Sequence, residues 1–245
     1  VIGYRAFTTA ETLSENTIVG PYAGRYLKTG NYSVAFGYAA LHGNSGDLTT
    51  SNAYNTALGY GALQYVSGAD NNVAIGFYAM NATDLTGDNN TAVGTQALRG
   101  VTSGYSNTMV GNAGSAITTG YENVGVGKGN LGNCAGGTYQ NTAIGHSAMY
   151  ATVGTVIGTT AVGYYAGSAP SGNYNTFMGW KAGKGTDNTA QQNVGVGSEA
   201  LTAITTAAYN VAIGYQALPN ANSASNNVAV GYLAMKDATT CLLYT

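Results

Sequence analysis

The chain has 245 residues, of which 44% are hydrophobic and only 7% are charged, with a formal net charge of −2. Neither sign of charge forms a run, which excludes the basic stripe that a nucleic-acid-binding surface requires. No apolar stretch approaches the ~20 residues of a membrane-spanning helix. We therefore expect no nucleic-acid partner and no membrane insertion in this segment.

A five-residue phrase, Asn-(Thr/Val)-small-apolar-Gly, recurs along the whole chain at steps of 16 to 18 residues, with one step of 22. A fixed short period is typical of a solenoid, in which each repeat is one coil stacked on the last. We predict an all-β protein, a parallel β-solenoid of β-roll or β-helix type with about 14 coils of ~17 residues. It would form a single continuous domain over 1–245. The glycines that end the copies are Gly3, Gly20, Gly37, Gly59, Gly76, Gly94, Gly111, Gly127, Gly145, Gly163, Gly179, Gly197, Gly214 and Gly231.

The position just before the glycine is apolar in every copy, and a β-branched Thr or Val usually stands two residues earlier. This alternation predicts a short strand that turns one face inward. We therefore expect the pre-glycine column to form the core. Its members are Val19, Phe36, Leu58, Ile75, Val93, Val110, Val126, Ile144, Val162, Met178, Val196, Ile213 and Val230.

The residue between these two positions is then expected to point outward, yet it is mostly alanine. Small apolar residues on an exposed strand face indicate that another surface lies against them. The column predicts an oligomer interface, and a single coil cannot fold alone, because its few buried side chains do not offset the ordering of its backbone. The predicted interface residues are Ala74, Ala92, Ala143, Ala161, Ala212 and Ala229.

The rest of each coil is rich in turn-forming residues. Asn at the start of the phrase suits a corner, because it tolerates left-handed backbone and hydrogen-bonds its own main chain. The glycine suits a corner or a close approach of a neighbouring backbone.

An aromatic side chain often follows the glycine directly. A ladder of rings that packs coil on coil is one interpretation, and a glycan-binding strip is the other. The strip would comprise Tyr38, Tyr60, Phe77, Tyr164, Trp180, Tyr215 and Tyr232. An ice-binding plane on the recurring Thr column is disfavoured, since that column is interrupted by Val and is expected to point inward.

No motif carries catalytic chemistry. The runs Gly125–Gly129 and Gly179–Thr186 resemble phosphate loops, but their glycines arise from the repeat, and no helix is expected after the first. His42 and His146 have no sequence partners for a metal site or a catalytic triad, and the carboxylates are scattered. We expect no catalytic residue, no metal and no cofactor.

Two cysteines, Cys134 and Cys241, lie six coils apart. At about 4.8 Å per coil they are roughly 29 Å apart along the axis, beyond the ~7 Å limit on the Cα separation of a disulfide. We expect no disulfide between them within one chain. The first residues fall inside a repeat and the last coil has no polar cap, which predicts a piece of a longer fibre chain.

The phrases NNVAIG (71–76), NVAIG (210–214) and NNVAVG (226–231) resemble the repeats of trimeric autotransporter adhesin heads, whose chains form left-handed parallel β-rolls that trimerise. The longer form NTAIGxxAL, at 141–149 with Met as its last residue, is similar to repeats of phage tail-fibre proteins. The resemblance implies a homotrimer, intertwined or side by side, with the alanine column at the threefold axis. The coils, about 17.5 residues long on average, are longer than the adhesin repeat.

We therefore expect a non-enzymatic structural shaft of a phage-like or injection-system tail fibre that mediates host attachment, located outside the cell on a virion or a cell surface. The alternatives are the head or stalk of a bacterial trimeric adhesin, or a glycan-binding module. The partners would be further copies of the chain and a host glycan or protein receptor. The long step at His42–Tyr54 predicts a bulging loop, which carries recognition or is only a spacer.

Overall fold

The computed structural model describes residues 1–8, 14–45, 52–134, 137–151, 154–169, 172–185 and 189–238. These residues form an all-β parallel solenoid of about 12 turns, which confirms the predicted fold class with slightly fewer coils than the 14 expected. The first copy contributes only a single bridge, between Ile2 and Val19. Helices are absent from the described residues, so none is present there that could cross a membrane.

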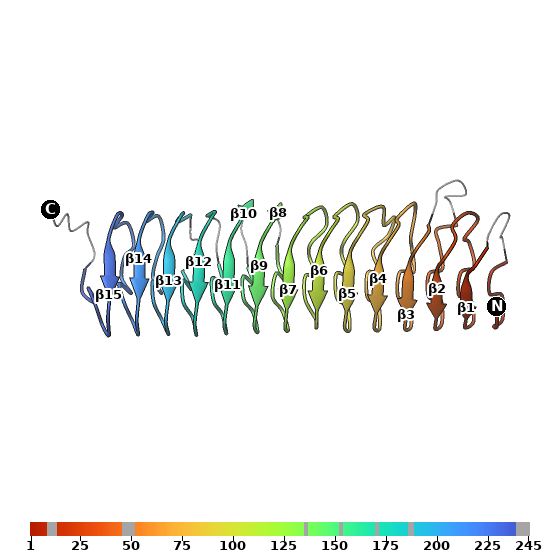
Figure 1. Cartoon of the computed structure of the whole chain (residues 1–245), viewed down its shortest axis with the longest axis horizontal. Coiled ribbons are helices and arrows are strands. Elements are labelled where there is room, and N and C mark those ends of the chain that lie inside the picture. The colour runs from red at the N-terminus through yellow and green to blue at the C-terminus, as the bar shows by residue number, and fades with distance from the viewer. Residues whose placement is uncertain are drawn as a thin grey trace. The chain divides into compact units, whose positions relative to one another are not determined.

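The chain divides into two compact units, Val1–Glu122 and Asn123–Thr245. In the first unit each coil supplies one short strand to a parallel sheet, and consecutive strands are neighbours (Figure 1). The strands are β1 (Thr17–Val19), β2 (Val34–Phe36), β3 (Thr56–Leu58), β4 (Val73–Ile75), β5 (Thr91–Val93) and β6 (Thr108–Val110).

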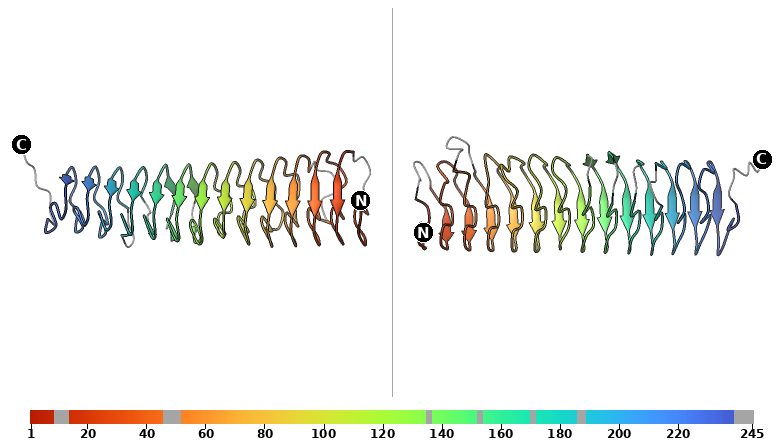
Figure 2. Two further views of the ribbon diagram at one scale, coloured as in Figure 1. Left: turned by 60° about the horizontal axis from the view of Figure 1, so that its bottom comes forward. Right: turned by 180° about the vertical axis from the view of Figure 1, so that it is seen from behind.

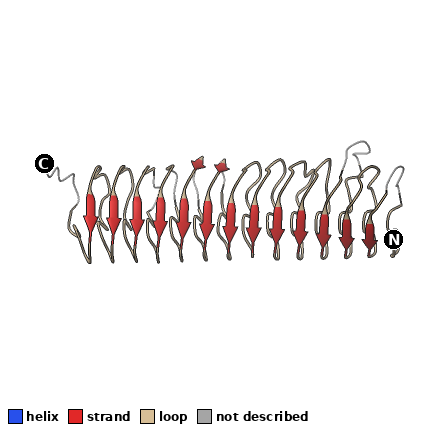
Figure 3. Cartoon of the chain, viewed as in Figure 1, coloured by secondary structure: helices blue, strands red, loops and turns tan. Residues whose placement is uncertain are grey.

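The second unit repeats this plan and adds a small parallel pair, formed by β8 (Thr138–Tyr139) and β10 (Val156–Ile157), each of which is followed, after two intervening residues, by a strand of the main sheet. Outside the strands each described coil consists of turns and extended segments (Figures 2 and 3). The strands of its main sheet are β7 (Val124–Val126), β9 (Thr142–Ile144), β11 (Thr160–Val162), β12 (Thr176–Met178), β13 (Val194–Val196), β14 (Val211–Ile213) and β15 (Val228–Val230).

The repeat phrase is in register from coil to coil, so equivalent residues stand side by side. Ala74 of β4, for example, is paired with Ala57 of β3 and Ala92 of β5. The phrase glycine must be glycine because its backbone has φ near +130° and because its neighbour is very close. A Cβ on Gly76 would lie 2.5 Å from the carbonyl oxygen of Gly94. The predicted close backbone approach is therefore confirmed.

The burial of the strands is the reverse of the predicted one. The middle residue of every main-sheet strand is buried, whereas the residues on both sides of it are exposed or half-exposed. Ile75 is 37% exposed and Met178 is 46% exposed, while Ala74 is 0% exposed. The prediction that the pre-glycine column forms the core is wrong, because a one-residue error in strand phase exchanges the two faces. Its other members are likewise not buried: Val19, Phe36, Leu58, Val93, Val110, Val126, Ile144, Val162, Val196, Ile213 and Val230.

The core is made by the alanine column together with the apolar residues that follow each glycine. In the coil of β3, Ala57 packs in the same interior as Ala62 and Leu63, all 0% exposed. A large side chain on one side of the coil faces a small residue on the other side. Where the strand carries the large Phe177, a glycine, Gly183, replaces the usual Leu, and a Cβ there would collide with the phenyl ring. Close packing of a thin coil requires this complementarity.

The asparagine that starts each phrase forms a ladder inside the stack. Asn90 is 0% exposed; its backbone N–H donates to Asn72 Oδ1 at 2.8 Å, and its Nδ2 donates to Gly104 O, also at 2.8 Å. Equivalent bonds link the other coils within each unit. The left-handed residue is the one before the asparagine, for example Asn89 with φ 59°. The predicted bond to the residue's own main chain is also present, for example from Asn72 Nδ2 to Asp70 O at 3.0 Å, beside the bonds to the neighbouring coils.

The reversed burial predicts that an inward alanine tolerates no enlargement. Ala143→Leu adds three carbon atoms to a packed interior between Gly125 and Ala161, and should lower the free energy of unfolding by about 1–3 kcal/mol. Denaturant unfolding followed by circular dichroism measures the effect. The control Thr118→Leu, an enlargement on an exposed turn outside the strands, should change stability by less than about 0.5 kcal/mol. Equal losses in both variants would contradict the assigned burial.

Candidate functional site

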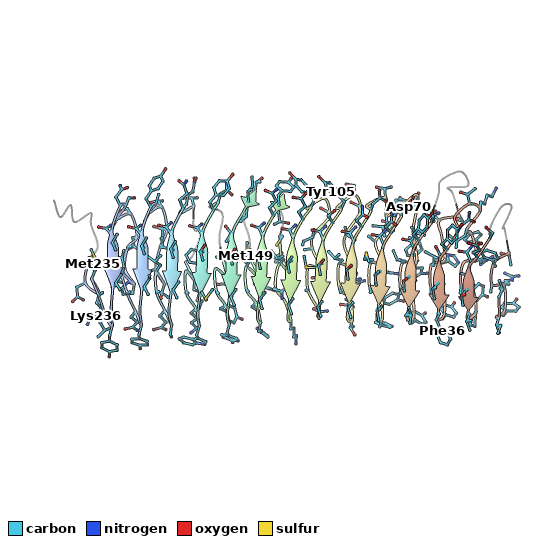
Figure 4. All side chains as sticks on the ribbon, viewed as in Figure 1. Phe36, Asp70, Tyr105, Met149, Met235 and Lys236 are labelled. Carbon is cyan, nitrogen blue, oxygen red and sulfur yellow. The ribbon has the colours of Figure 1, made fainter. Side chains whose placement is uncertain are left out.

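The outward side of each main sheet is the most unusual surface of the described chain. Its two columns consist only of Thr and Val at the first strand position and of Val, Ile, Leu, Met or Phe at the third. We call this surface the strand face. The pre-glycine residues on it include Phe36, Leu58, Ile144 and Ile213, which are 60, 37, 39 and 41% exposed. Phe36 is labelled in Figure 4, near the end of its strand.

The strand face is large, flat in character and uncharged. In the first unit twelve side chains, two from each of six strands, are displayed side by side. The partly exposed apolar side chains among them lie side by side, and contiguous exposed apolar surface is typical of interaction sites in soluble proteins. Main-sheet strands in both units carry no Lys, Arg, Asp or Glu.

The predicted oligomer interface is corrected by the same burial. The alanine column lies inside the coil, with exposures of 0 to 1%, so its side chains cannot touch another chain. The affected residues are Ala74, Ala92, Ala143, Ala161, Ala212 and Ala229. The expectation that this column faces a threefold axis is wrong, and the pre-glycine column is the apolar surface that is available instead.

The Thr column also points outward, although it was expected to point inward. Thr17 and Thr108 are exposed, and the others on the strands are half-exposed. The ice-binding alternative gains accessible hydroxyl groups from this. However, the adjoining column varies in size from Val to Phe, so the strand face has no regular lattice of identical groups.

An aromatic row follows the strand face at the turn after each glycine. In the first unit Tyr38 stacks on Tyr60 with ring centroids 4.9 Å apart and planes at 10°, and Tyr60 stacks on Phe77 at 5.6 Å and 28°. A hydrogen bond with Tyr78 raises the pKa of Tyr60 above its ordinary value. These rings use their flat faces to contact one another, as an aromatic ladder does.

The row is less uniform in the second unit. Tyr215 stacks on Tyr232 at 5.5 Å and 14°, and Tyr164 stacks on the imidazole of His146 at 5.4 Å and 28°. Trp180, 44% exposed, is covered differently, because the ammonium group of Lys181 lies 4.0 Å from its ring centroid. Glycan binding by the row stays a prediction, but most of its ring faces are already occupied by neighbouring rings.

A second aromatic row, at the opposite end of the strands, was not predicted. Tyr32 stacks on Tyr54 at 5.2 Å and 8°, and Tyr105 stacks on Tyr121 at 4.9 Å and 7°. Tyr105 is labelled in Figure 4 together with the nearby strand-start residue Asp70. The sequence signal for this row was a tyrosine that stands one or two residues before the phrase asparagine.

The remaining candidates show no catalytic arrangement. No group of three or more His, Cys, Asp or Glu side chains that could hold a metal occurs among the described residues. Gly179–Gly185, the described part of the phosphate-loop look-alike, is a turn of the solenoid without a helix. Burial lowers the pKa of His42, whose imidazole contacts the ring of Tyr26 edge-on.

Cys134 is buried, and Cys241 lies outside the described residues. The long step at His42–Tyr54 also lies partly outside them, because 46–51 are not described. At its base the backbone N–H of Asn44 donates to Val66 O, and the Asn44 side chain hydrogen-bonds Asp84. The role of this loop stays a prediction.

Comparison with known proteins does not add to this description. No protein-family model matches the chain, and no similarity was found to a curated protein or to a solved structure.

Proposed function

We propose that the chain is a non-enzymatic structural shaft that self-associates through its strand face. The observation that carries the proposal is the exposed pre-glycine column, apolar in every main-sheet strand, beside an uncharged column of Thr and Val. A monomer in water would leave this surface exposed at a cost that association removes. A second copy is the occupant that fits best, because it has the same coil spacing and so matches the columns residue by residue.

The proposed assembly is a homotrimer, with the strand faces turned toward a common axis. The number of copies is suggested by the resemblance of NNVAIG and NNVAVG to repeats of fibrous trimers. The interface is the strand face and not the alanine column that the sequence predicts. In this arrangement Ile75, Ile144 and Ile213 would meet their counterparts from the other copies. The small size of most residues on the strand face allows three chains to approach closely.

The proposed setting is an extracellular tail fibre of a virion or an injection system, where a shaft holds a receptor-binding part away from the particle. A bacterial surface adhesin is the second candidate and would use the same self-association. The low charge, the repeat and the absence of a visible reaction centre among the described residues support a structural role over an enzymatic one.

Sedimentation equilibrium tests the assembly directly. The wild-type chain of 24.8 kDa should sediment with three times its own mass. The double variant Leu58→Asp with Ile75→Asp places like charges close together in the assembly and should give monomers with unchanged circular dichroism. A matched control, Thr118→Asp, lies on an exposed turn away from the strand face and should leave the mass unchanged.

A stable wild-type monomer would refute self-association, and a dimer would refute the trimer while leaving the strand face as the interface. If the double variant also retained the wild-type mass, the interface would lie elsewhere on the molecule.

A further inference from the structure

Three lysines and four aromatic side chains gather at the post-glycine turns of the second unit, away from the strand face. Successive coils place Lys128, His146, Tyr164 and Trp180 directly after their glycines, and the backbone N–H of Ser147 donates to Lys128 O at 2.9 Å. We call these four residues, together with Tyr165, Lys181 and Lys184, the cationic strip. Half of the chain's eight Lys and Arg residues lie at post-glycine turns of this unit, and three of these four belong to the strip.

Two of the three lysines of the cationic strip, Lys181 and Lys184, lie against aromatic rings. The Lys181 ammonium is 4.0 Å from the centroid of the Trp180 ring, and the Lys184 ammonium is 5.7 Å from that of Tyr165. Tyr165 in turn contacts Tyr164 edge-on at 4.6 Å. Each ammonium group is thus held beside an exposed or half-exposed aromatic side chain, where it remains able to pair with an anion.

Trp180 follows a glycine as the other rings of the aromatic row do, but no neighbouring aromatic ring stacks on it among the described residues. The Tyr38, Tyr60 and Phe77 rings cover one another, whereas no ring–ring contact of Trp180 occurs among the described residues. Its indole is nevertheless 44% exposed. A flat apolar ring of this kind packs against the apolar face of a sugar, while the neighbouring ammonium can pair with a carboxylate on that sugar.

The surrounding charge is compatible with an anionic ligand. The neighbouring described carboxylate is that of Glu199, on the next coil, and it accepts a hydrogen bond from Gln216 Nε2 at 2.6 Å. Glu199 therefore lies at one edge of the cationic strip, and its carboxylate is already hydrogen-bonded to a residue of the following coil. The few lysines and the net charge of −2 do not favour a nucleic acid, which demands many phosphate contacts.

We propose that the cationic strip binds a carboxylated polysaccharide, with Trp180 contacting a sugar ring and Lys181 and Lys184 pairing with the carboxylates. This site goes beyond the structural role of the shaft and does not depend on the number of copies in the assembly. It assigns a ligand to one part of the aromatic row and leaves the stacked rings of the row as structural elements.

Biolayer interferometry with immobilised polygalacturonate tests the site on the full chain. The wild type should bind, and its affinity should fall as NaCl is raised from 0.1 to 0.5 M. The double variant Lys181→Gln with Lys184→Gln, and the variant Trp180→Ala, should each weaken binding at least tenfold. Lys236→Gln is the matched control, since Lys236 occupies the same position after its glycine as Lys184 and should leave binding unchanged.

Dextran, a neutral polysaccharide, and a single-stranded oligonucleotide serve as comparison probes. Equal binding to dextran, tighter binding to the oligonucleotide, or no binding to polygalacturonate would each overturn the proposal. So would an equal loss in Lys236→Gln. Circular dichroism and the sedimentation mass of each variant show whether a loss of binding is local, so the test can fail while self-association stands.

Discussion

Replacing Gly197 by alanine is expected to disrupt the solenoid of the second unit, with a loss of more than about 4 kcal/mol in unfolding free energy. The added Cβ would lie 2.5 Å from the carbonyl oxygen of Gly214 in the next coil. The Cβ would be fixed to the hydrogen-bonded backbone of one coil and the oxygen belongs to that of the next, so neither can move aside. The residue also has φ +128°, a conformation that alanine adopts only under strain.

Gly231→Ala separates the two causes of this loss. Gly231 has nearly the same backbone, with φ +130°, but the nearest atom to an added Cβ is 4.0 Å away, on Ala234. Its cost should therefore be only the conformational strain, on the order of 1–3 kcal/mol. Urea unfolding followed by circular dichroism compares the variants. Equal destabilisation would mean that strain alone, and not the contact between coils, selects glycine in this column.

Asn193→Ala is expected to remove about 3–5 kcal/mol of stability, because it leaves several buried groups without partners at once. The Asn193 Oδ1 accepts from the backbone N–H of Asn210 at 3.0 Å, and its Nδ2 donates to Ala207 O at 3.0 Å. The residue is 0% exposed, so water cannot replace these bonds without opening the stack.

The chain itself supplies a matched substitution for this test. Ser33 occupies the same column in the first unit, and its hydroxyl oxygen accepts from the backbone N–H of Asn55 at 3.1 Å. Asn193→Ser should therefore keep the acceptor and lose less stability than Asn193→Ala. Hydrogen exchange at the Asn210 amide should rise more in the alanine variant. If serine and alanine proved equally damaging, the amide donor rather than the acceptor would carry the ladder.

The architecture could be predicted from the sequence because every coil has the same conformational and packing requirements. The glycine column needs φ near +130° and the close approach of the next backbone, and no other residue type meets both. Parallel pairing in register follows, since equivalent residues such as Thr91 and Thr108 must stand side by side. The period therefore predicted the strands and the stacking, although it did not predict which side of each strand is buried.

The strand phase was misjudged because hydrophobicity alone was used to choose the inner face. Aliphatic side chains on an outer face follow the same alternation as a core, so their pattern does not separate the two. A better signal was present within the repeats. The middle strand residue is large at Phe177 where the later core position is Gly183, and small at Gly195 where that position is Leu201. Two columns that exchange volume must share one interior.

The side-chain arrangement of the proposed binding surfaces was less predictable than the fold, since it depends on contacts between coils. The sequence indicated rings after each glycine, but not that Tyr38 and Tyr60 would cover one another while Trp180 would contact Lys181. These differences arise from single substitutions in otherwise equivalent coils. The strand face was visible in the sequence as well, once the inward direction of the alanine column is known.

The asparagine ladder and the backbone bonds between strands run along the stacking axis of each unit. Tension on that axis therefore pulls directly against these bonds, and because the interfaces between coils are in series, each carries the whole load and the weakest one opens first. A coil of ~17 residues that opens can extend to roughly 55–60 Å, although it occupied only about 4.8 Å in the stack. Each unit therefore lengthens by more than ten times its coil spacing at each rupture, and so dissipates a sudden pull stepwise.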